Sequence, residues 1–308
     1  MNKKKNELTP ASFAKIFNDK ESNFSLLLQK TIKKFNFEYK IVEGKEYEEA
    51  ISKIEKTLES NLKVSGPHRI NDWEKGWGEH LSEFNQGGFN NLVAKFSMQG
   101  EYIRLQGNLL KPESNSFEED FVAVIRAYLF NKYFKKIKTL YEFGAGTGVN
   151  LVAASEILPK VKLMGLDWTD SSAAIMNLLR EKLKINLFGK KFDLFNPDKK
   201  YRLEKNCGVL TVGTLEQLGS NFKPFINYLL ENKPNICIHL ETLYELYDEN
   251  NLLDYLARKY LEKRNYLTGF LPYLQQLQAK RKIEILEIRR TFGSFYHEGY
   301  TYTVWKPI

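Results

Sequence analysis

The pattern of apolar positions changes character near residue 138. Before this point apolar residues recur at helical spacing, which predicts helices over 11–18, 25–37, 47–62 and 117–136. After it, short apolar runs alternate with amphipathic segments. The runs predict strands over 139–143, 162–167, 190–194, 207–212, 235–240, 282–289 and 300–305. The intervening segments predict helices over 148–158, 171–182 and 222–231, and a long helical region over 249–280 that is bent or broken around Gly269 and Pro272.

This alternation predicts an α/β fold with a seven-stranded, mostly parallel sheet covered by helices on both faces. The last two strands are joined by a connection too short for a parallel crossover, so this pair should be antiparallel. We expect a mainly helical N-terminal lid and acceptor-binding region over 1–114 and an α/β domain over 115–308.

The strongest local signal is a glycine-rich loop between a predicted strand and helix. Gly144, Gly146 and Gly148 alternate with Ala145 and Thr147. Such glycines let the backbone approach a ligand closely, and the helix start leaves N–H groups free for polar ligand atoms. The GxGxG spacing departs from the GxGxxG dinucleotide fingerprint. No Lys-Ser/Thr pair follows the glycines, which excludes a P-loop.

An acid ends the next predicted strand. Asp167 lies 19 residues after Gly148, where a carboxylate can accept hydrogen bonds from both hydroxyls of a ribose. The glycine loop and Asp167 together predict a site for a ligand that contains an adenosine.

With these motifs the sequence resembles the class I S-adenosylmethionine-dependent methyltransferases, which have a Rossmann-like sheet, and it is similar to bacterial small-molecule or sugar O-methyltransferases. Glu142 and the three glycines match the first family motif, and the resemblance covers about residues 115–308. It implies a cofactor site at Glu142, Gly144, Ala145, Gly146, Thr147, Gly148, Asn150, Asp167, Trp168, Asp193 and Leu194, with Arg104 reaching the cofactor carboxylate from across the cleft. Bracing of the loop by Glu142, a core position for Trp168 and a turn cap at Asp193 remain alternatives.

Three residues near strand ends are candidates for catalysis. Glu216 follows the fourth strand of the sheet, and His239 and Glu241 end the fifth. A spacing of two on a strand places His239 and Glu241 on one face, where they could act as a base and its orienting carboxylate. The alternative is that these side chains satisfy buried backbone groups.

Acceptor binding is expected from the N-terminal region and from segments late in the chain. The candidates are Trp73, Trp77, His80, Tyr244 and His297, with Tyr247 and Arg264 as further pocket-lining residues. Amphipathic aromatics suit a sugar or a planar small molecule. For the tryptophans the alternative is packing into the core; for His297 it is an exposed turn.

Composition narrows the class of partner. The net charge is +8, but 36 of the 46 basic residues are Lys, which are more typical of a solvated surface than of phosphate recognition, so a nucleic-acid partner is disfavoured. Two isolated cysteines and no ligand spacing predict neither disulfides nor a metal site. No apolar run suggests a membrane span, so we expect a cytoplasmic enzyme; a homo-oligomer stays open.

We therefore expect methyl transfer from S-adenosylmethionine to a small polar acceptor, with a hydroxyl of a sugar or related metabolite as the first choice. A small-molecule N-methyltransferase, an RNA or protein methyltransferase, and a non-catalytic cofactor-binding protein are the alternatives. The segment Gly213–Glu216 lacks the Asn/Asp-Pro-Pro-Tyr-like loop that methylation of planar amines would require.

Overall fold

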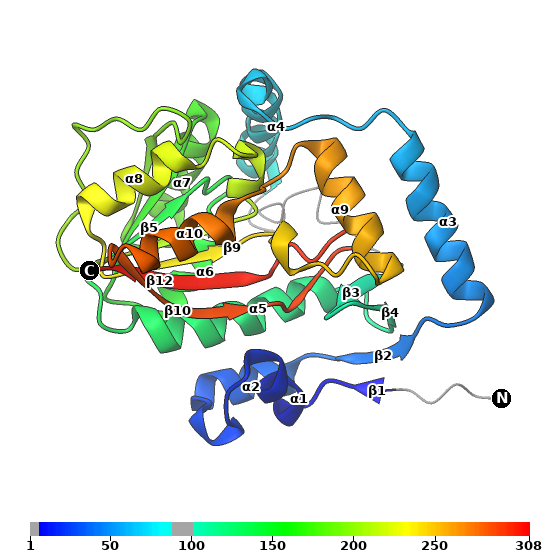
Figure 1. Cartoon of the computed structure of the whole chain (residues 1–308). Coiled ribbons are helices and arrows are strands. Elements are labelled where there is room, and N and C mark those ends of the chain that lie inside the picture. The colour runs from blue at the N-terminus through cyan, green and yellow to red at the C-terminus, as the bar shows by residue number, and fades with distance from the viewer. Residues whose placement is uncertain (1–5, 88–100) are drawn as a thin grey trace.

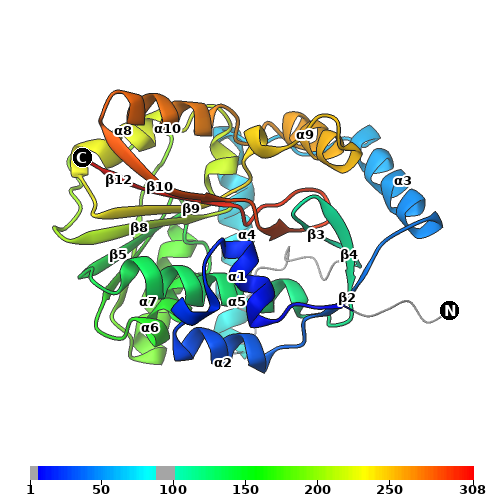
Figure 2. The same ribbon diagram turned by 60° about the horizontal axis from the view of Figure 1, so that its bottom comes forward.

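The structure, a computed structural model, describes residues 6–87 and 101–308. Part of the predicted lid stretch, 88–100, lies outside this range. The chain forms two sheets, of seven and five strands, with helices around them (Figures 1 and 2).

The larger sheet has the strand order β10-β12-β9-β8-β5-β6-β7. Its strands are β5 (Thr139–Phe143), β6 (Lys162–Asp167), β7 (Leu187–Lys191), β8 (Cys207–Val212), β9 (Ile236–Leu240), β10 (Ile283–Arg289) and β12 (Tyr302–Pro307). Strands β5 to β9 are parallel, whereas β12 is antiparallel to both β9 and β10. This confirms the predicted Rossmann-like sheet. The predicted bounds of β7 were wrong, because the strand begins at Leu187, three residues before the predicted start. Gly189 belongs to the strand and packs closely against α7: a Cβ there would lie 2.3 Å from the Ala173 carbonyl oxygen.

Helices cover both faces of this sheet (Figure 2). On one side lie α5 (Phe117–Leu129), α6 (Val149–Ile157) and α7 (Asp170–Leu183); on the other lie α8 (Lys223–Asn232) and α10 (Phe270–Ala279). The predicted helical region 249–280 is two helices, since α9 (Leu252–Arg264) ends at Asn265 in a left-handed conformation with φ 52°. Gly269, also left-handed, begins α10.

The N-terminal region contains four α-helices among the described residues: α1 (Pro10–Phe17), α2 (Leu26–Lys34), α3 (Lys45–Glu59) and α4 (Ile70–Gly87). It also contributes four short strands that the sequence did not predict: β1 (Asn6–Glu7), β2 (Glu38–Ile41), β3 (Ile103–Leu105) and β4 (Asn108–Pro112). With β11 (Phe292–Gly293), from near the C-terminus, they form the second sheet in the order β1-β2-β4-β3-β11.

A cluster of phenylalanines joins the N-terminal helices to the rest of the chain. The ring of Phe13 lies 5.1 Å from Phe37 and 5.0 Å from Phe121 of α5. Phe121 in turn lies 3.9 Å from Phe292 of β11. All four side chains are fully or almost fully buried, so the two sheets share one hydrophobic core.

Two N-terminal helices pack elsewhere. Helix α3 lies against α9, and α4 lies against α7 at the top of Figure 1. Because α7 follows β6, this packing brings α4 to the carboxyl edge of the large sheet.

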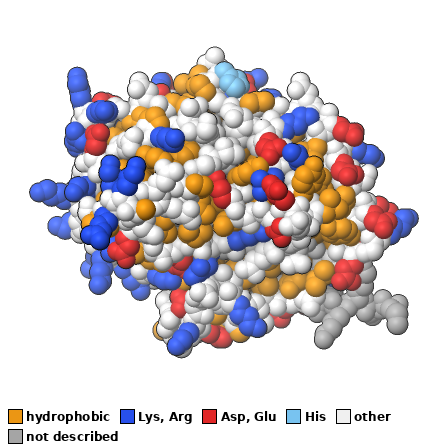
Figure 3. Space-filling view, in the orientation of Figure 1, with side chains coloured by type: hydrophobic (Ala, Val, Ile, Leu, Met, Phe, Trp, Pro, Cys, Tyr) orange, Lys and Arg blue, Asp and Glu red, His pale blue; other side chains and the backbone are white. Residues whose placement is uncertain are grey.

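The surface carries the mixture of basic and acidic side chains expected from the composition (Figure 3). Figure 3 shows Lys and Arg side chains scattered over one face, most densely towards its left edge, with acidic side chains between them. Within residues 6–87 and 101–308, no helix has the length and apolar character needed to cross a membrane.

Candidate functional site

A cavity of about 190 Å³ lies at the carboxyl ends of β5, β6 and β8. In open α/β sheets this edge is where ligands bind. Its wall includes most of the residues expected to hold a cofactor, namely Gly144, Ala145, Gly146, Thr147, Asn150, Asp167, Trp168 and Leu194, together with Trp73 and Trp77. The structure therefore brings together residues that lie up to 121 positions apart in the sequence.

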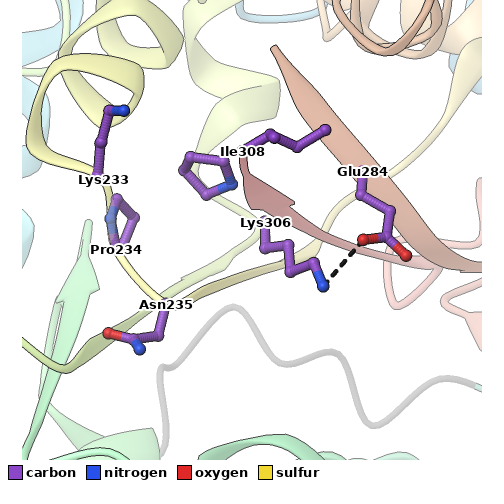
Figure 4. A pocket seen from close by; sticks show the side chains of 7 residues that line it. Lys233, Pro234, Asn235, Glu284, Lys306 and Ile308 are labelled. Carbon is purple, nitrogen blue, oxygen red and sulfur yellow. Dashed lines mark ion pairs between the residues drawn. The ribbon is translucent and has the colours of Figure 1, made fainter. Parts of the chain in front are cut away.

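A second hollow, about 540 Å³, lies near the C-terminus at the amino edge of the parallel strands (Figure 4). Its side chains include Asn235, which precedes β9, and the ion pair of Lys306 with Glu284 at 2.8 Å. It is wide open to solvent and contains none of the residues that the sequence singled out. We therefore take the carboxyl-edge cavity as the candidate site.

The glycine loop has a conformation that only glycine adopts without strain. Gly144, Gly146 and Gly148 have φ of 71°, 53° and 75°. A Cβ at Gly144 would lie 2.3 Å from Oγ1 and Cγ2 of Thr214, in the loop after β8. A Cβ at Gly146 would lie 2.9 Å from the ring of Trp77. The loop is therefore pressed between two other segments of the cavity wall.

Asp167, at the end of β6, braces this loop. Its Oδ2 accepts a hydrogen bond from the Gly146 N–H at 3.0 Å, and its Oδ1 accepts from the N–H and hydroxyl of Thr169 at 3.1 and 2.8 Å. A carboxylate has about four acceptor sites, so roughly one remains. The sequence predicted that Asp167 would hold both ribose hydroxyls; in this conformation it has room for one.

Aromatic and apolar side chains form the far wall of the cavity. The rings of Trp168 and Phe195 lie 5.6 Å apart, and Leu194 lies beside them in the wall. These side chains offer an apolar surface for a planar ring such as a purine. Asp193 does not join the wall: it is exposed and accepts a hydrogen bond from the Phe195 N–H at 2.8 Å, which is the turn cap that the sequence left as an alternative.

Helix α4 covers the cavity. Trp73 and Trp77 stack at 5.7 Å between ring centres, and Trp77 lies over Gly146. His80, one turn along, is buried 5.7 Å from Trp77 and does not join the wall. Since sites for drug-sized ligands usually exceed about 300 Å³, α4 must move before a molecule as large as S-adenosylmethionine can enter.

Glu74 fastens α4 to the start of α7. Its carboxylate accepts hydrogen bonds from the N–H groups of Asp170 and Ser171, at 2.8 and 3.0 Å, and from the Ser171 hydroxyl. Burial opposes the charge, but these hydrogen bonds prevail and lower the pKa of Glu74. An anion at a helix N-terminus is also favoured by the helix dipole.

We predict that Glu74→Ala speeds the association of S-adenosylhomocysteine several-fold and lowers the free energy of unfolding by about 0.5–2 kcal/mol, the usual cost of losing a helix cap. Stopped-flow tryptophan fluorescence measures the association rate, and Glu79→Ala on the exposed side of α4 is the matched control. Equal association rates for all three proteins would show that α4 does not gate the cavity.

A hydrogen-bonded row lies behind the glycine loop. Asn150 Nδ2 donates to Glu142 Oε1 at 2.7 Å, and Arg126 Nη1 donates to Asn150 Oδ1 at 3.0 Å. At the two ends of the row, Glu142 Oε2 and Arg126 Nε are buried without a hydrogen-bond partner. Burial raises the pKa of Glu142 to about 8. A carboxyl group at one end and a cation at the other suit the amino and carboxylate groups of an amino acid, because a bound ammonium group would favour the ionised form of Glu142.

The structure does not bring Arg104 to the cavity. Its side chain is fully buried in the second sheet, where Nη2 pairs with Asp254 at 2.8 Å and Nη1 donates to the Leu253 carbonyl at 2.9 Å. These bonds tie β3 to α9. Arg126, in α5, is the arginine that lies beside the glycine loop instead. One sequence signal could have identified Arg126, namely a charged residue within the otherwise apolar run 121–130.

His239 and Glu241 lie outside the cavity wall. His239 packs between Phe270 and Trp305, its Nδ1 bonds the Thr211 hydroxyl at 2.9 Å, and burial lowers its pKa to about 3. Glu241 accepts hydrogen bonds from the N–H groups of Thr214 and Glu216, at 3.1 and 3.3 Å. This corresponds to the alternative in which the side chains satisfy buried groups, and Glu241 thereby holds Thr214 against Gly144.

Glu216 lies one residue from the cavity wall, next to Gln217. Gln217 Nε2 donates to Glu216 Oε1 at 3.2 Å. Burial, reinforced by the nearby charge of Glu241, raises the pKa of Glu216 to about 8, although the Gln217 hydrogen bond and the charge of Arg264 act the other way. At neutral pH the carboxyl group is therefore mostly protonated, as a poised acid or base would be.

This pKa predicts a pH-dependent stability. The unfolded chain releases the Glu216 proton near its ordinary pKa of 4.5, whereas the folded chain keeps it until about 8. The contribution of Glu216 to stability therefore falls as pH rises from about 4.5 to 8. Relative to Glu216→Gln, the wild type should lose roughly 2–4 kcal/mol across this window, measured by urea unfolding at several pH values. Parallel pH curves would contradict the raised pKa.

Two further acceptor candidates lie away from the cavity wall. Tyr244 donates through its hydroxyl to Glu262 at 2.6 Å and accepts from Arg258 at 2.9 Å, so it belongs to the surface of α9. His297 is not an exposed turn residue: it stacks 5.7 Å from Tyr260 and lies 5.8 Å from Tyr266, and burial lowers its pKa to about 3.

The sequence did not single out two further titratable groups whose pKa is raised, Glu118 of α5 and Tyr300 of the final loop. Burial raises the pKa of Glu118 to about 7. Burial and the charge of Glu118 raise the pKa of the Tyr300 phenol, whereas the charge of Arg126 lowers it. Because 182 residues separate them along the chain, no local pattern in the sequence links the two.

The described residues contain no group of three or more His, Cys, Asp and Glu side chains arranged to hold a metal ion. The two cysteines, Cys207 and Cys237, are buried and unpaired on neighbouring strands.

No family model and no curated protein sequence matches this chain. Among solved structures, the chain is similar to geranyl diphosphate C-methyltransferase from Streptomyces coelicolor A3(2), with 10% identity and a TM-score of 0.44 over 64% of this chain and 86% of that one. It is also similar to magnesium protoporphyrin IX methyltransferase from Synechocystis PCC 6803, with 13% identity and a TM-score of 0.46 over 62% of this chain and 83% of that one. A SAM-dependent methyltransferase from Aquifex aeolicus is 15% identical, with a TM-score of 0.40 over 58% of this chain and 88% of that one. At sequence identities this low, the similarity to these structures concerns the fold alone. The strand order and the antiparallel end pair of the large sheet give this chain a Rossmann-like α/β fold.

Proposed function

We propose that this protein is an S-adenosylmethionine-dependent methyltransferase that acts on a small polar acceptor. The observation that carries the proposal is the row of Glu142, Asn150 and Arg126 beside the glycine loop, with one unpartnered buried atom at each end. It would hold the amino-acid part of the cofactor. The remaining acceptor site of Asp167 would take a ribose hydroxyl, and the wall of Trp168 and Phe195 would contact the adenine.

S-adenosylmethionine supplies the methyl group as an electrophile, so the chain mainly has to position the acceptor and exclude water. Helix α4 covers the cavity and would provide the exclusion. Glu216, held neutral beside the cavity wall, is the residue best placed to exchange a proton with the acceptor. His239 is less suited, because a pKa of about 3 makes it a weak base.

A hydroxyl of a sugar or related metabolite is our first choice of acceptor, and a small amine is the alternative. The cover of the cavity by Trp73 and Trp77 of α4 favours a small acceptor over RNA or protein. The scattered Lys residues, interspersed with acids on the surface, also argue against a nucleic-acid track.

The test uses S-adenosylmethionine labelled in the methyl group. The purified protein is incubated with a metabolite extract, with total RNA and with a protein mixture, and the label is traced by mass. We expect label in the small-molecule fraction alone, attached to oxygen. Label attached to nitrogen would favour the amine alternative, and label in RNA or protein would overturn the small-acceptor proposal. Cofactor binding without transfer to any fraction would instead favour a non-catalytic cofactor-binding protein.

A further inference from the structure

Two arginines lack the ion pair that the other buried or half-buried arginines have. Seven of the ten arginines pair with a carboxylate, and Arg281 is exposed. Among the described residues, Arg126 and Arg264 have no carboxylate within 4 Å, and each has a buried Nε without a partner. The stretches 1–5 and 88–100 contain no Asp or Glu, so they cannot supply one.

Arg264 is held rigidly at the end of α9. Its guanidinium lies 5.8 Å from the ring centre of Tyr260 and 4.8 Å from that of Tyr266, and its Nη1 donates to the Tyr260 hydroxyl at 3.3 Å. The Arg264 carbonyl accepts a hydrogen bond from the Ser65 N–H at 2.8 Å. Two tyrosines close in sequence therefore hold the guanidinium, and Ser65 holds the Arg264 backbone.

The groups around Arg264 do not neutralise its charge. The charge of Arg264 acts on Glu216, but burial and the charge of Glu241 raise the pKa of Glu216 to about 8, so it is mostly neutral at pH 7. His297 is neutral as well, since burial, with the charges of Arg104 and Arg264, lowers its pKa to about 3. Arg264 is half-buried and its Nε–H is buried without a partner, which is unfavourable unless a ligand oxygen accepts that hydrogen bond.

The two arginines point to two different anions. Arg126 lies beside the glycine loop, where the cofactor carboxylate would lie under the proposed function. Arg264 is not part of the cavity wall, but Ser65 links it to the wall: Ser65 N–H donates to the Arg264 carbonyl at 2.8 Å and its hydroxyl to the carbonyl of Glu216 at 3.4 Å, next to the wall residue Gln217. One anionic group from the cofactor therefore accounts for Arg126 and leaves Arg264 for the acceptor.

We propose that Arg264 binds a carboxylate or phosphate group of the acceptor, so that the substrate is a small anionic metabolite. The proposal rests on the proposed function. The planar guanidinium, with its buried Nε–H unused, can donate two parallel hydrogen bonds to such an oxyanion. The phenols of Tyr260 and Tyr266 and the neutral His297 ring would surround the rest of the molecule.

The test measures binding of simple anions to the full chain saturated with S-adenosylhomocysteine, which would occupy Arg126. Inorganic phosphate and, separately, malonate are titrated at constant ionic strength, and the melting temperature is recorded. We expect a saturable rise with at least one of them, which identifies the anionic group as phosphate or carboxylate. In Arg264→Gln the apparent affinity should fall at least tenfold.

Arg258→Gln is the matched control, because Arg258 lies on the same helix but pairs with the exposed Glu249. It should behave as wild type. Arg264→Lys keeps the charge and should retain an intermediate affinity; it replaces Arg264→Gln if that variant does not fold. The proposal would be overturned if neither anion raised the melting temperature, or if the rise in melting temperature were equal in the wild type and the Arg264 variants. Failure of S-adenosylhomocysteine to bind would instead refute the proposed function.

Discussion

Replacing Gly144 with alanine is expected to abolish measurable binding of S-adenosylmethionine. A side chain at φ 71° costs roughly 1–2 kcal/mol by itself. The new Cβ would also lie 2.3 Å from two atoms of Thr214, and relieving such an overlap typically costs about 1–3 kcal/mol. Thr214 cannot withdraw freely, because Glu241 holds its N–H at 3.1 Å. The loop must therefore move, and the cofactor site with it.

A control variant separates the backbone strain of a positive φ from the steric clash with Thr214. Gly269 has a similar φ of 75°, but a Cβ there would meet nothing within 4 Å. Gly269→Ala should therefore lose a little stability and keep full affinity for S-adenosylhomocysteine, measured by calorimetry. In the Gly144→Ala protein, adding Thr214→Ala removes both atoms at 2.3 Å and should restore part of the binding. Unchanged affinity in Gly144→Ala alone would mean that the loop does not contact the cofactor.

Arg126→Gln is expected to weaken S-adenosylhomocysteine binding by 10- to 100-fold. Hydrogen bonds to charged groups contribute about 1.5–3 kcal/mol, and Arg126 is the cation at the glycine loop with an unused buried Nε. The loss should depend on the amino-acid part of the ligand. Methylthioadenosine, which lacks that part, should bind the wild type and the variant equally.

Arg180→Gln, an exposed arginine of α7 beside Glu181, is the control for the loss of one positive charge. It should leave both affinities unchanged. An equal loss for S-adenosylhomocysteine and methylthioadenosine in Arg126→Gln would show that Arg126 supports the fold of the loop and does not bind the carboxylate.

The sequence was most informative where structure is local. The run from β5 through the glycine loop into α6 could be predicted because glycine spacing and helix start lie within a dozen residues. Asp167 followed from its place at the end of β6. About half of the cavity wall could be named from the glycine loop and the strand ends, because consecutive parallel strands end at the same edge of a sheet.

The features that sequence reasoning missed depend on distant contacts. Strands β1 and β11 have two residues each, too few for an alternating pattern, and β11 pairs with β3 almost 190 positions away. The role expected of Arg104 failed for the same reason, since its partner Asp254 is 150 residues away. The sequence predicted one strand face for His239 and Glu241, but β9 ends at Leu240, and strand spacing does not show whether a face meets a cavity or a core.

Calorimetric titration of S-adenosylhomocysteine into the wild-type chain tests the central claim most directly. We expect saturable binding of one ligand per chain, with an affinity that falls in Arg126→Gln and disappears in Gly144→Ala. No binding up to millimolar ligand, or binding that is unchanged in both variants, would contradict a cofactor site at the carboxyl edge of the sheet.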